Sequence, residues 1–300
     1  MEQRPARIQA KRALSPSRVL ATLATFAILG AGASGCMPPV QHTAVPAARQ
    51  QEDIRPMQLL QPVEHASKRD AVVRLVSRGN VTCTGALIAD DRVLTAHHCI
   101  SARDARGRVQ ERDMAPEDIQ VELGGEDFPW GEVKVRAIVA PQCGYVAGEG
   151  DIAILVLERH LIGMPTYTVR MESAPELKAI IQVFGFGRCA LSADAIHFHP
   201  RDVDGIDSVA AGQFTAKASI CPGDSGGPVL NSRDDLLGVV SASVMDGDDK
   251  TKGASIFTRA DAWQQLFSAA QEISAGASPG ELPPYGDCHA GPPGPKPKGK

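Results

Sequence analysis

The sequence predicts an all-β fold, because its core shows mostly two-residue periodicity, frequent turn residues and only one strong helix pattern. Over residues 69–274, short runs rich in β-branched residues recur and are broken at short intervals by Gly, Pro, Asn and Asp. Such a succession of short strands is typical of a β-sandwich or barrel. We find no internal repeat of fixed period.

The expected strands follow one another along this core. They cover residues 71–76, 86–88, 92–95, 119–123, 133–139, 152–157, 179–184, 227–230, 237–244 and 255–258. A helix is expected over residues 260–275, where Trp263, Leu266, Phe267 and Ile273 share one side.

The composition is that of an ordinary globular protein. Of the 300 residues, 43% are hydrophobic, 22% charged and 4% aromatic, which excludes a collagen-like, coiled-coil or wholly disordered chain. The net charge of −4 provides no basic field, so we expect no nucleic-acid partner.

The first 35 residues have the pattern of a signal peptide. Residues 1–18 are basic, residues 19–35 are uncharged and apolar, and small residues end the run. Residues 33–36, Ala-Ser-Gly-Cys, resemble the bacterial lipoprotein box, which implies cleavage before Cys36 and lipidation of its thiol. Seven cysteines is an odd number, and assigning Cys36 to a lipid leaves six to pair. The alternative is cleavage after Ala33, with Cys36 as a spare thiol.

Either cleavage predicts an exported protein, held in the bacterial cell envelope by its lipid or secreted, where disulfides can form. The lipid would be its only contact with a membrane. Residues 36–68 contain five prolines among polar residues and are expected to form a flexible tether. Residues 275–300 form a tail rich in Pro, Gly and Lys, which leaves residues 69–274 as the folded domain.

Three short stretches carry residue types suited to acyl transfer. They are Cys-Pro-Gly-Asp-Ser-Gly-Gly-Pro at 221–228, Leu-Thr-Ala-His-His-Cys at 94–99 and Asp-Ile-Ala-Ile-Leu at 151–155. Acyl transfer needs a nucleophile, a base, a group that orients the base, and donors for the developing oxyanion. Ser225, His98 and Asp151 fit the first three roles in that order.

These stretches, in this order along the chain, resemble the signatures of the chymotrypsin/trypsin-like serine peptidases. The resemblance covers about residues 70–274. It implies two six-stranded antiparallel β-barrels with a C-terminal helix, and an active site between the barrels. It also implies an oxyanion hole made by the amides of Gly223 and Ser225. We expect protein or peptide substrates, no cofactor, no metal and a monomer.

A second motif match can be set aside. Gly223-x-Ser225-x-Gly227 also fits the nucleophile elbow of α/β-hydrolases, which requires Ser, then acid, then His along the chain. The only His after Ser225 is His289, in the tail, and Pro228 begins a predicted strand where the elbow needs a helix.

Other titratable residues are weaker candidates for the site. His97 takes the place of the second Ala of the family box, and we expect it to be a hydrogen-bonded neighbour of the base. The other acids considered as orienting groups are Asp113, Asp118 and Asp127. We expect the remaining histidines of the core to lie at the surface, and they are His160, His197 and His199. His197 and His199 alternate as on one strand face, which is a weak metal-binding pattern.

The resemblance implies a disulfide between Cys83 and Cys99, beside the base. It further suggests pairing of Cys189 with Cys221 and of Cys143 with Cys288. Six cysteines allow fifteen pairings, so the sequence leaves this second part open.

The resemblance also indicates which residues would line the substrate pocket. Ser219 stands at the pocket base, where no carboxylate is available for an Arg or Lys side chain. Ser243 and Ser255 stand where trypsin-like members have wall glycines, which favours small or medium apolar P1 residues. The segment Ser241-Ala242-Ser243 resembles the edge that pairs with substrate backbone. Alternatively, the acids at 246, 248 and 249 approach the pocket from the following loop.

One family feature is missing. No Ile-Val-Gly-Gly activation site lies upstream of Cys83. In activated members, the freed amine of that segment pairs with the Asp before the nucleophile, here Asp224. A buried unpaired carboxylate is costly, so Asp224 requires another cation or a cut between Arg55 and Arg69.

The sequence therefore predicts an exported serine endopeptidase. Two other functions remain open. One is a catalytically silent binding protein on the same scaffold, because the activation motif is missing. The other is an exported esterase that uses the same triad.

Overall fold

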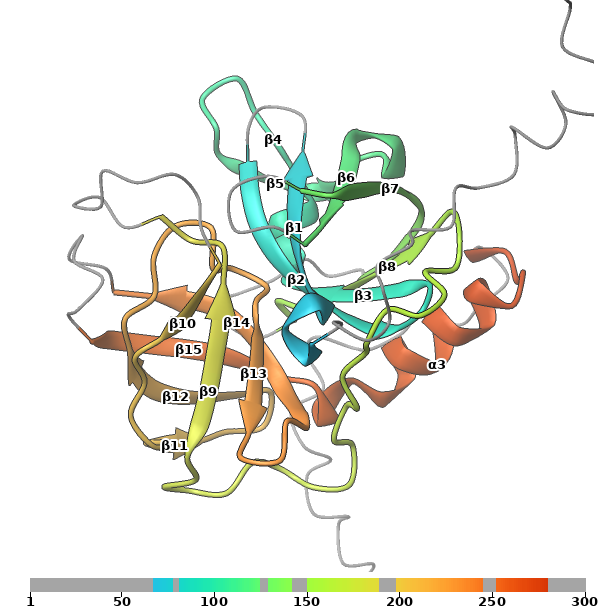
Figure 1. The fold of residues 1–300 in the computed structure, drawn as a ribbon. Helices are drawn as coiled ribbons and strands as arrows, with labels where there is room; N and C mark the ends of the chain where they lie inside the picture. Colours follow the sequence, from blue (N-terminus) through green and yellow to red (C-terminus); the bar gives the residue numbers. More distant parts are fainter. Residues whose placement is uncertain are drawn as a thin grey trace, which may run out of the picture. The chain divides into compact units, whose positions relative to one another are not determined.

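The computed structural model describes residues 67–77, 81–124, 129–141, 150–188, 198–244 and 252–279. Within these ranges the regular structure is almost entirely β-strand, followed by one longer helix (Figure 1). The expected all-β class with a C-terminal helix is confirmed. The expected signal peptide, Cys36, nearly all of the tether and Cys288 lie outside the described residues.

Six strands close into an antiparallel barrel (Figure 1). In order around the barrel they are β1 (Val72–Ser77), β2 (Val81–Ala89), β3 (Arg92–Thr95), β8 (Ala153–Leu157), β7 (Gly131–Val139) and β6 (Ile119–Leu123). In β6 the buried residues alternate with half-buried polar ones, as expected of a strand with one face in the core. All five residues of β8 are buried, because the C-terminal helix packs against this strand from outside the barrel.

Short helices and strands precede or connect the barrel strands along the chain. α2 (His97–Ile100) follows β3 after a single residue, while β4 (Ser101–Arg103) and β5 (Val109–Asp113) form a two-stranded sheet. The 3-10 helices η2 (Lys68–Ala71) and η3 (Pro116–Asp118) precede β1 and β6. Most of these elements are too short to show a period, and β5, with the sequence VQERD, contains a single apolar residue, which explains why the sequence did not predict them.

The second half of the domain is a seven-stranded sheet. Its order is β10 (His199–Arg201), β9 (Ile181–Gly185), β13 (Pro228–Asn231), β14 (Leu236–Ser243), β15 (Gly253–Arg259), β12 (Gln213–Ala218) and β11 (Ser208–Val209). The expectation was a second closed six-stranded barrel. The sheet turns back on itself through one isolated bridge, Val203 to Ala218, which brings the segment after β10 against β12. Two backbone hydrogen bonds flank this bridge, from Ser219 N to Asp202 O at 2.9 Å and from Asp204 N to Lys217 O at 2.8 Å. The segment from β10 to β11 therefore meets β9 at one end and β12 along the rest, as in a barrel.

All ten expected strands coincide with observed ones, but β12 was missed. Its sequence alternates, with Phe214, Ala216 and Ala218 buried. The small alanines weaken the hydrophobic signal that marks a strand. In the structure the Phe214 ring stacks on Phe257 of β15, with ring centroids 5.2 Å apart.

The expected helix is present. The 3-10 turn η4 (Asp261–Trp263) leads into α3 (Gln264–Ser274), which packs against β7 and β8. Its buried side is formed by Leu266, Ala269, Ala270 and Ile273. Arg136 of β7 donates a hydrogen bond of 3.0 Å to the carbonyl oxygen of Ile273, which also accepts one from the Gly276 amide at the helix end.

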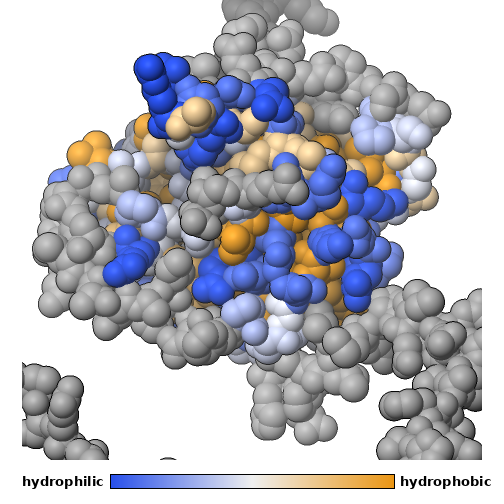
Figure 2. Space-filling view, turned by 90° about the horizontal axis from the view of Figure 1, so that it is seen from above, coloured by the Kyte–Doolittle hydropathy of each residue, from blue (hydrophilic) through white to orange (hydrophobic). Residues whose placement is uncertain are grey.

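Most large apolar side chains of the described residues lie inside. The exceptions are Ile162, Leu177, Ile180 and Val244. On the face drawn in Figure 2, hydrophobic surface is visible in patches between hydrophilic side chains. None of the described helices is long and apolar enough to span a membrane.

Candidate active site

Strand pairing brings His98 and Asp151 together. β3 and β8 are antiparallel neighbours, and Thr95 at the end of β3 pairs with Ala153 at the start of β8. His98 follows β3 on α2, and Asp151 precedes β8. Both side chains are therefore delivered to the same end of the barrel, although 53 positions separate them.

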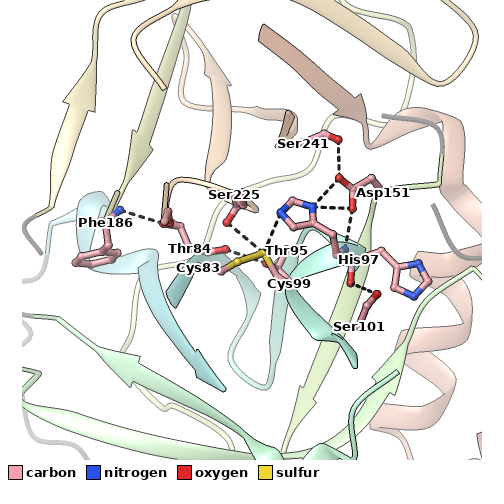
Figure 3. Close-up of a disulfide and its surroundings, with 12 residues drawn as sticks. Cys83, Thr84, Thr95, His97, Cys99, Ser101, Asp151, Phe186, Ser225 and Ser241 are labelled. Carbon is pink, nitrogen blue, oxygen red and sulfur yellow. Dashed lines mark hydrogen bonds and ion pairs between the residues drawn. A yellow bond between two sulfur atoms is a disulfide. The ribbon is translucent and has the colours of Figure 1, made fainter. Parts of the chain in front are cut away.

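Asp151 binds both the imidazole ring and the backbone amide of His98. His98 Nδ1 lies 2.9 Å from Asp151 Oδ2 and 3.1 Å from Oδ1, while the His98 amide donates to Oδ1 at 2.9 Å. Ser241 Oγ donates a further hydrogen bond to Oδ2 (Figure 3). Burial alone would raise the pKa of Asp151, but the hydrogen bonds and charge of His98 and the Ser241 hydroxyl hold it below its usual value. The Asp151 carboxylate is therefore ionised, and it orients the His98 ring.

Ser225 lies in the turn that precedes β13. The Thr84 amide of β2 donates a hydrogen bond of 2.8 Å to the Ser225 carbonyl oxygen. His98 Nε2 and the Ser225 carbonyl oxygen both approach Cys99 Sγ, at 3.8 and 3.5 Å. The nitrogen of His98 that does not meet Asp151 thus faces the Ser225 side of the site. No hydrogen bond joins Ser225 Oγ to His98 here, which is common in serine hydrolases without substrate.

The residues before Ser225 form a turn that presents backbone amides. Asp224 N donates to Cys221 O at 3.0 Å, with Pro222 and Gly223 at the two central positions. Gly223 has a φ of +106°, so this is a type II turn, which requires Gly at its third position. A Cβ at Gly223 would also lie 2.9 Å from the Gly187 Cα.

The peptide between Pro222 and Gly223 is held in one orientation. The Pro222 carbonyl accepts a hydrogen bond of 2.8 Å from the Arg188 amide. Because C=O and N–H of a trans peptide point in opposite directions, the Gly223 amide is directed away from Arg188. Among the described residues, the amides of Gly223 and Ser225 donate no hydrogen bond, so both remain available to a ligand oxygen.

Thr84 is a positioning residue that the sequence analysis missed. Its buried hydroxyl donates to Gly223 O at 2.7 Å and accepts from the Phe186 amide at 3.0 Å (Figure 3). One side chain of the barrel therefore ties down two segments of the second sheet. The sequence shows that Thr84 directly follows Cys83, but it does not show that Thr84 contacts Gly223 and Phe186.

Arg201 is the second missed residue, and it supplies the cation that Asp224 requires. Its Nη2 donates to Asp224 Oδ1 at 2.9 Å, and its Nε lies 2.8 Å from Oδ2. The contact at Nε has the distance of an ion pair but not the angle of a hydrogen bond. Burial raises the pKa of Asp224, against the opposing effects of Arg201 and of the Cys221 and Gly187 amides.

His97 is hydrogen-bonded to an acid other than Asp151. It is buried, and its Nε2 lies 2.7 Å from Asp113 Oδ1. Figure 3 draws its ring turned away from Ser225. Asp113 is thereby occupied, Asp118 lies in η3, and Asp127 is outside the described ranges.

The disulfide between Cys83 and Cys99 is confirmed, and its two cysteines are 16 positions apart. It joins β2 to α2, the helix that carries His98 (Figure 3). Cys221 is also disulfide-bonded. Cys143, Cys189 and Cys288 lie outside the described residues, so the pairing expected for Cys221 stays a prediction.

The expected pocket residues lie near one another in the second sheet. Ser243 and Ser255 are direct strand partners, and their hydroxyls are 2.8 Å apart. The Ser255 hydroxyl also donates toward the Gly253 carbonyl at 3.2 Å. Ser219 is buried, and its hydroxyl accepts a hydrogen bond of 3.0 Å from the Asp202 amide. The acids at 246, 248 and 249 lie outside the described residues.

Among the described residues, one edge of β14 is open beside these serines. β14 pairs with β13 as far as Val239, and Val240 adds two hydrogen bonds to Gly226 and Gly227. Ser241, Ala242 and Ser243 continue beyond β13 while remaining paired with or adjacent to β15. A substrate strand can add to an edge of this kind.

The remaining histidines do not approach this site in the described structure. His160 is exposed and pairs with Asp90 at 3.0 Å. His199 is exposed on β10, and His197 lies outside the described residues, so the weak metal pattern stays untested.

Comparisons with known proteins agree with the fold. A protein-family model described as Trypsin matches residues 61–266, which is more than half of the chain. Among solved structures, the scabies mite inactivated protease paralogue S-D1 is 17% identical at a TM-score of 0.54, over 70% of this chain and 94% of that one.

Two further structures are similar to the same extent. A Glu endopeptidase in complex with MPD is 15% identical at a TM-score of 0.53, over 70% of this chain and 93% of its own. The scabies mite inactivated protease paralogue S-I1 is 20% identical at a TM-score of 0.53, over 71% of this chain and 98% of that one. At these identities the likeness concerns the fold alone.

Proposed function

The chain belongs to the trypsin family, and from that premise we propose that it is a serine endopeptidase that works through an acyl-enzyme. Ser225 is the nucleophile, His98 the general base and acid, and Asp151 the group that orients His98. The observation that carries this proposal is the buried Asp151 carboxylate, which meets both the amide and Nδ1 of His98. This contact leaves His98 Nε2 to face the Ser225 side.

The proposed chemistry follows from these contacts. Ser225 Oγ attacks the scissile carbonyl carbon while its proton passes to His98 Nε2. Asp151 stabilises the imidazolium that results. The oxyanion accepts hydrogen bonds from the amides of Gly223 and Ser225, and His98 then returns the proton to the leaving amine. Water repeats the sequence to release the acyl group.

The available donors support this role for Gly223 and Ser225. Both amides lack hydrogen bonds among the described residues, and Arg188 holds the Pro222–Gly223 peptide in place. Loss of one oxyanion donor generally costs about 10²–10³ in kcat, so the fixed turn is expected to matter for rate.

We propose a preference for small or medium apolar P1 residues. Ser219 offers no negative charge to a basic side chain, and its hydroxyl is already hydrogen-bonded to Asp202. The linked hydroxyls of Ser243 and Ser255 add bulk where wall glycines would leave the pocket deep. The open edge of β14 at Ser241–Ser243 would hold the substrate backbone.

A fluorophosphonate probe tests the nucleophile. The protein would be labelled with its disulfides intact, and the adduct located by peptide mapping. We expect one adduct at Ser225, absent in Ser225→Ala and retained in Ser268→Ala, a matched change on α3. Asp151→Asn is expected to lower kcat about 10⁴-fold, as in serine-peptidase triads generally. Labelling that persists in Ser225→Ala would refute the assignment.

A silent binding protein is the alternative that one observation favours. Two of the similar structures carry the description of inactivated protease paralogues. Peptide binding without labelling of a folded, disulfide-bonded protein would support it. An esterase would instead turn over an ester substrate while failing on the matched amide.

We also propose that the protein is exported and works as a monomer without a cofactor or metal. The Cys83–Cys99 disulfide supports an oxidising compartment. Lipidation at Cys36 is tested by mass spectrometry of the membrane fraction. The lipid mass is expected on the wild-type protein and not on Cys36→Ser.

A further inference from the structure

We propose that Arg201 is a built-in counter-ion that positions the oxyanion turn, so that the chain needs no cut upstream of its domain to become active. This inference rests on the proposed function and concerns how the same site is assembled. It starts from Asp224, the residue between the two oxyanion amides.

The Asp224 carboxylate is fully enclosed and meets four donor groups. Oδ1 accepts from the Gly187 amide at 2.8 Å and from Arg201 Nη2 at 2.9 Å. Oδ2 accepts from the Cys221 amide at 2.8 Å and lies 2.8 Å from Arg201 Nε. The side-chain exposures are 0% for Asp224 and 4% for Arg201. A buried carboxylate with this set of partners is charge-balanced within the domain.

These contacts reach the oxyanion turn on both sides. Cys221 begins the turn, and its amide binds Asp224 directly. Gly187 is held twice, by its amide to Asp224 and by its carbonyl to Arg201 Nη2 at 2.6 Å. The next residue, Arg188, fixes the Pro222 carbonyl and with it the direction of the Gly223 amide. A continuous set of contacts therefore runs from Arg201 to the Gly223 amide.

The cation comes from the sheet and not from a chain end. Arg201 ends β10 and pairs with Val183 of β9, in the same sheet as β13. This register places the guanidinium beside Asp224 as soon as the sheet forms. No liberated amine is required for charge balance.

The surroundings of Asp224 also leave little room for another cation. A Cβ at Gly185 would lie 2.2 Å from Asp224 Oδ1, and a Cβ at Gly187 would lie 2.5 Å from the carboxyl carbon. Both glycines thus pack directly against the carboxylate. An incoming terminal amine would have to displace Arg201 or one of these segments.

The first test uses the full chain. It would be purified from an oxidising compartment, its intact mass measured, and the fluorophosphonate probe applied before and after a limited protease cuts between Arg55 and Arg69. We expect the uncut chain to label at Ser225 at a rate within about twofold of the cut chain. Labelling only after the cut overturns this inference and leaves the proposed function standing. Failure of both forms to label overturns the proposed function and this inference with it.

The second test concerns Arg201 itself. Arg201→Ala is expected to lower kcat by up to about 10²–10³-fold, the loss seen when an oxyanion donor is removed, with a smaller change in KM. Guanidinium ion added to Arg201→Ala, assayed well below its thermal transition, is expected to restore part of kcat, which a role in stability alone would not give. Arg233→Ala, which removes an exposed arginine paired with Asp235, is the matched control.

The variant could fail to fold, so Arg201→Lys keeps the test decisive. Lysine retains the charge but not both contacts, and we expect a folded protein with an intermediate kcat. Wild-type kcat in Arg201→Ala that still unfolds in a cooperative thermal transition overturns the inference.

Discussion

The hydroxyl of Thr84 donates a hydrogen bond of 2.7 Å to the carbonyl oxygen of Gly223. This contact joins β2 of the barrel to the oxyanion turn of the second sheet, across 139 positions of sequence. The proposed catalytic residues are divided in the same way, with His98 and Asp151 beside the barrel strands and Ser225 beside β13. Thr84 therefore links the two halves of the site at the turn where the oxyanion would form.

Thr84→Val is expected to weaken both stability and catalysis. Valine keeps the shape but leaves the buried Gly223 carbonyl and the Phe186 amide without their partner, which costs about 1–3 kcal/mol of unfolding free energy. We expect kcat to fall as well, because the turn is less firmly held. Urea unfolding and peptide turnover measure the two effects. Thr215→Val is the control, since that hydroxyl bonds only an exposed Ser208. Equal losses in the two variants would contradict the role of Thr84.

Stability is expected to depend on Asp151 in acid. Its pKa in the folded protein lies below the ordinary value of 3.8 because His98 and Ser241 outweigh the effect of burial. A lowered pKa gives a contribution that is present above the unfolded value and is lost as the pH falls through the folded one. The difference in unfolding free energy between wild type and Asp151→Asn should therefore be constant above about pH 5 and shrink toward pH 3. A difference that grows on acidification would show the opposite shift.

Opening the pocket should change specificity. Replacing both Ser243 and Ser255 by Gly removes the two hydroxymethyl groups that face each other at 2.8 Å. We expect the ratio of kcat/KM for Phe over Ala at P1 to rise about 10–200-fold, the range for small changes in pocket volume. Ser173→Gly, at an exposed position, serves as control. Wild-type cleavage after Arg or Lys would instead indicate that acids of the 245–251 loop enter the pocket.

Removing the disulfide should destabilise the segment that carries His98. A Cys83→Ser/Cys99→Ser variant opens a loop whose ends lie 16 positions apart, and closing a loop of about 15 residues is worth about 3 kcal/mol in the chain-entropy model. We expect a lower free energy of unfolding in denaturant and slower labelling of Ser225. Wild-type protein treated with a reductant should be destabilised at least as much as the variant, because the disulfide of Cys221 is reduced as well. A variant as stable as wild type would show that the neighbouring strands alone hold α2.

Local patterns explain how far the sequence could be interpreted. The barrel strands β3, β6 and β8 and the helix α3 were predicted, because burial of one face leaves a period of two or 3.6 in the chain itself. The turn around Ser225 was recognisable for a similar reason, since Pro and Gly at its centre and the glycines after the nucleophile reflect local backbone requirements. The Cys83–Cys99 disulfide came from resemblance and is confirmed. The short strands β10 and β11 were missed because two or three residues cannot show a period.

What only the tertiary structure decided is which distant side chains meet. The sequence indicated that Asp224 needs a cation, but many Lys and Arg residues could have served. Strand pairing selects Arg201, 23 positions away, because the register of β10 on β9 sets it beside the carboxylate. In the same way Ser241 reaches Asp151 over 90 positions. Local composition determines strands and turns, whereas charge and hydrogen-bond partners depend on the register of strands far apart in the chain.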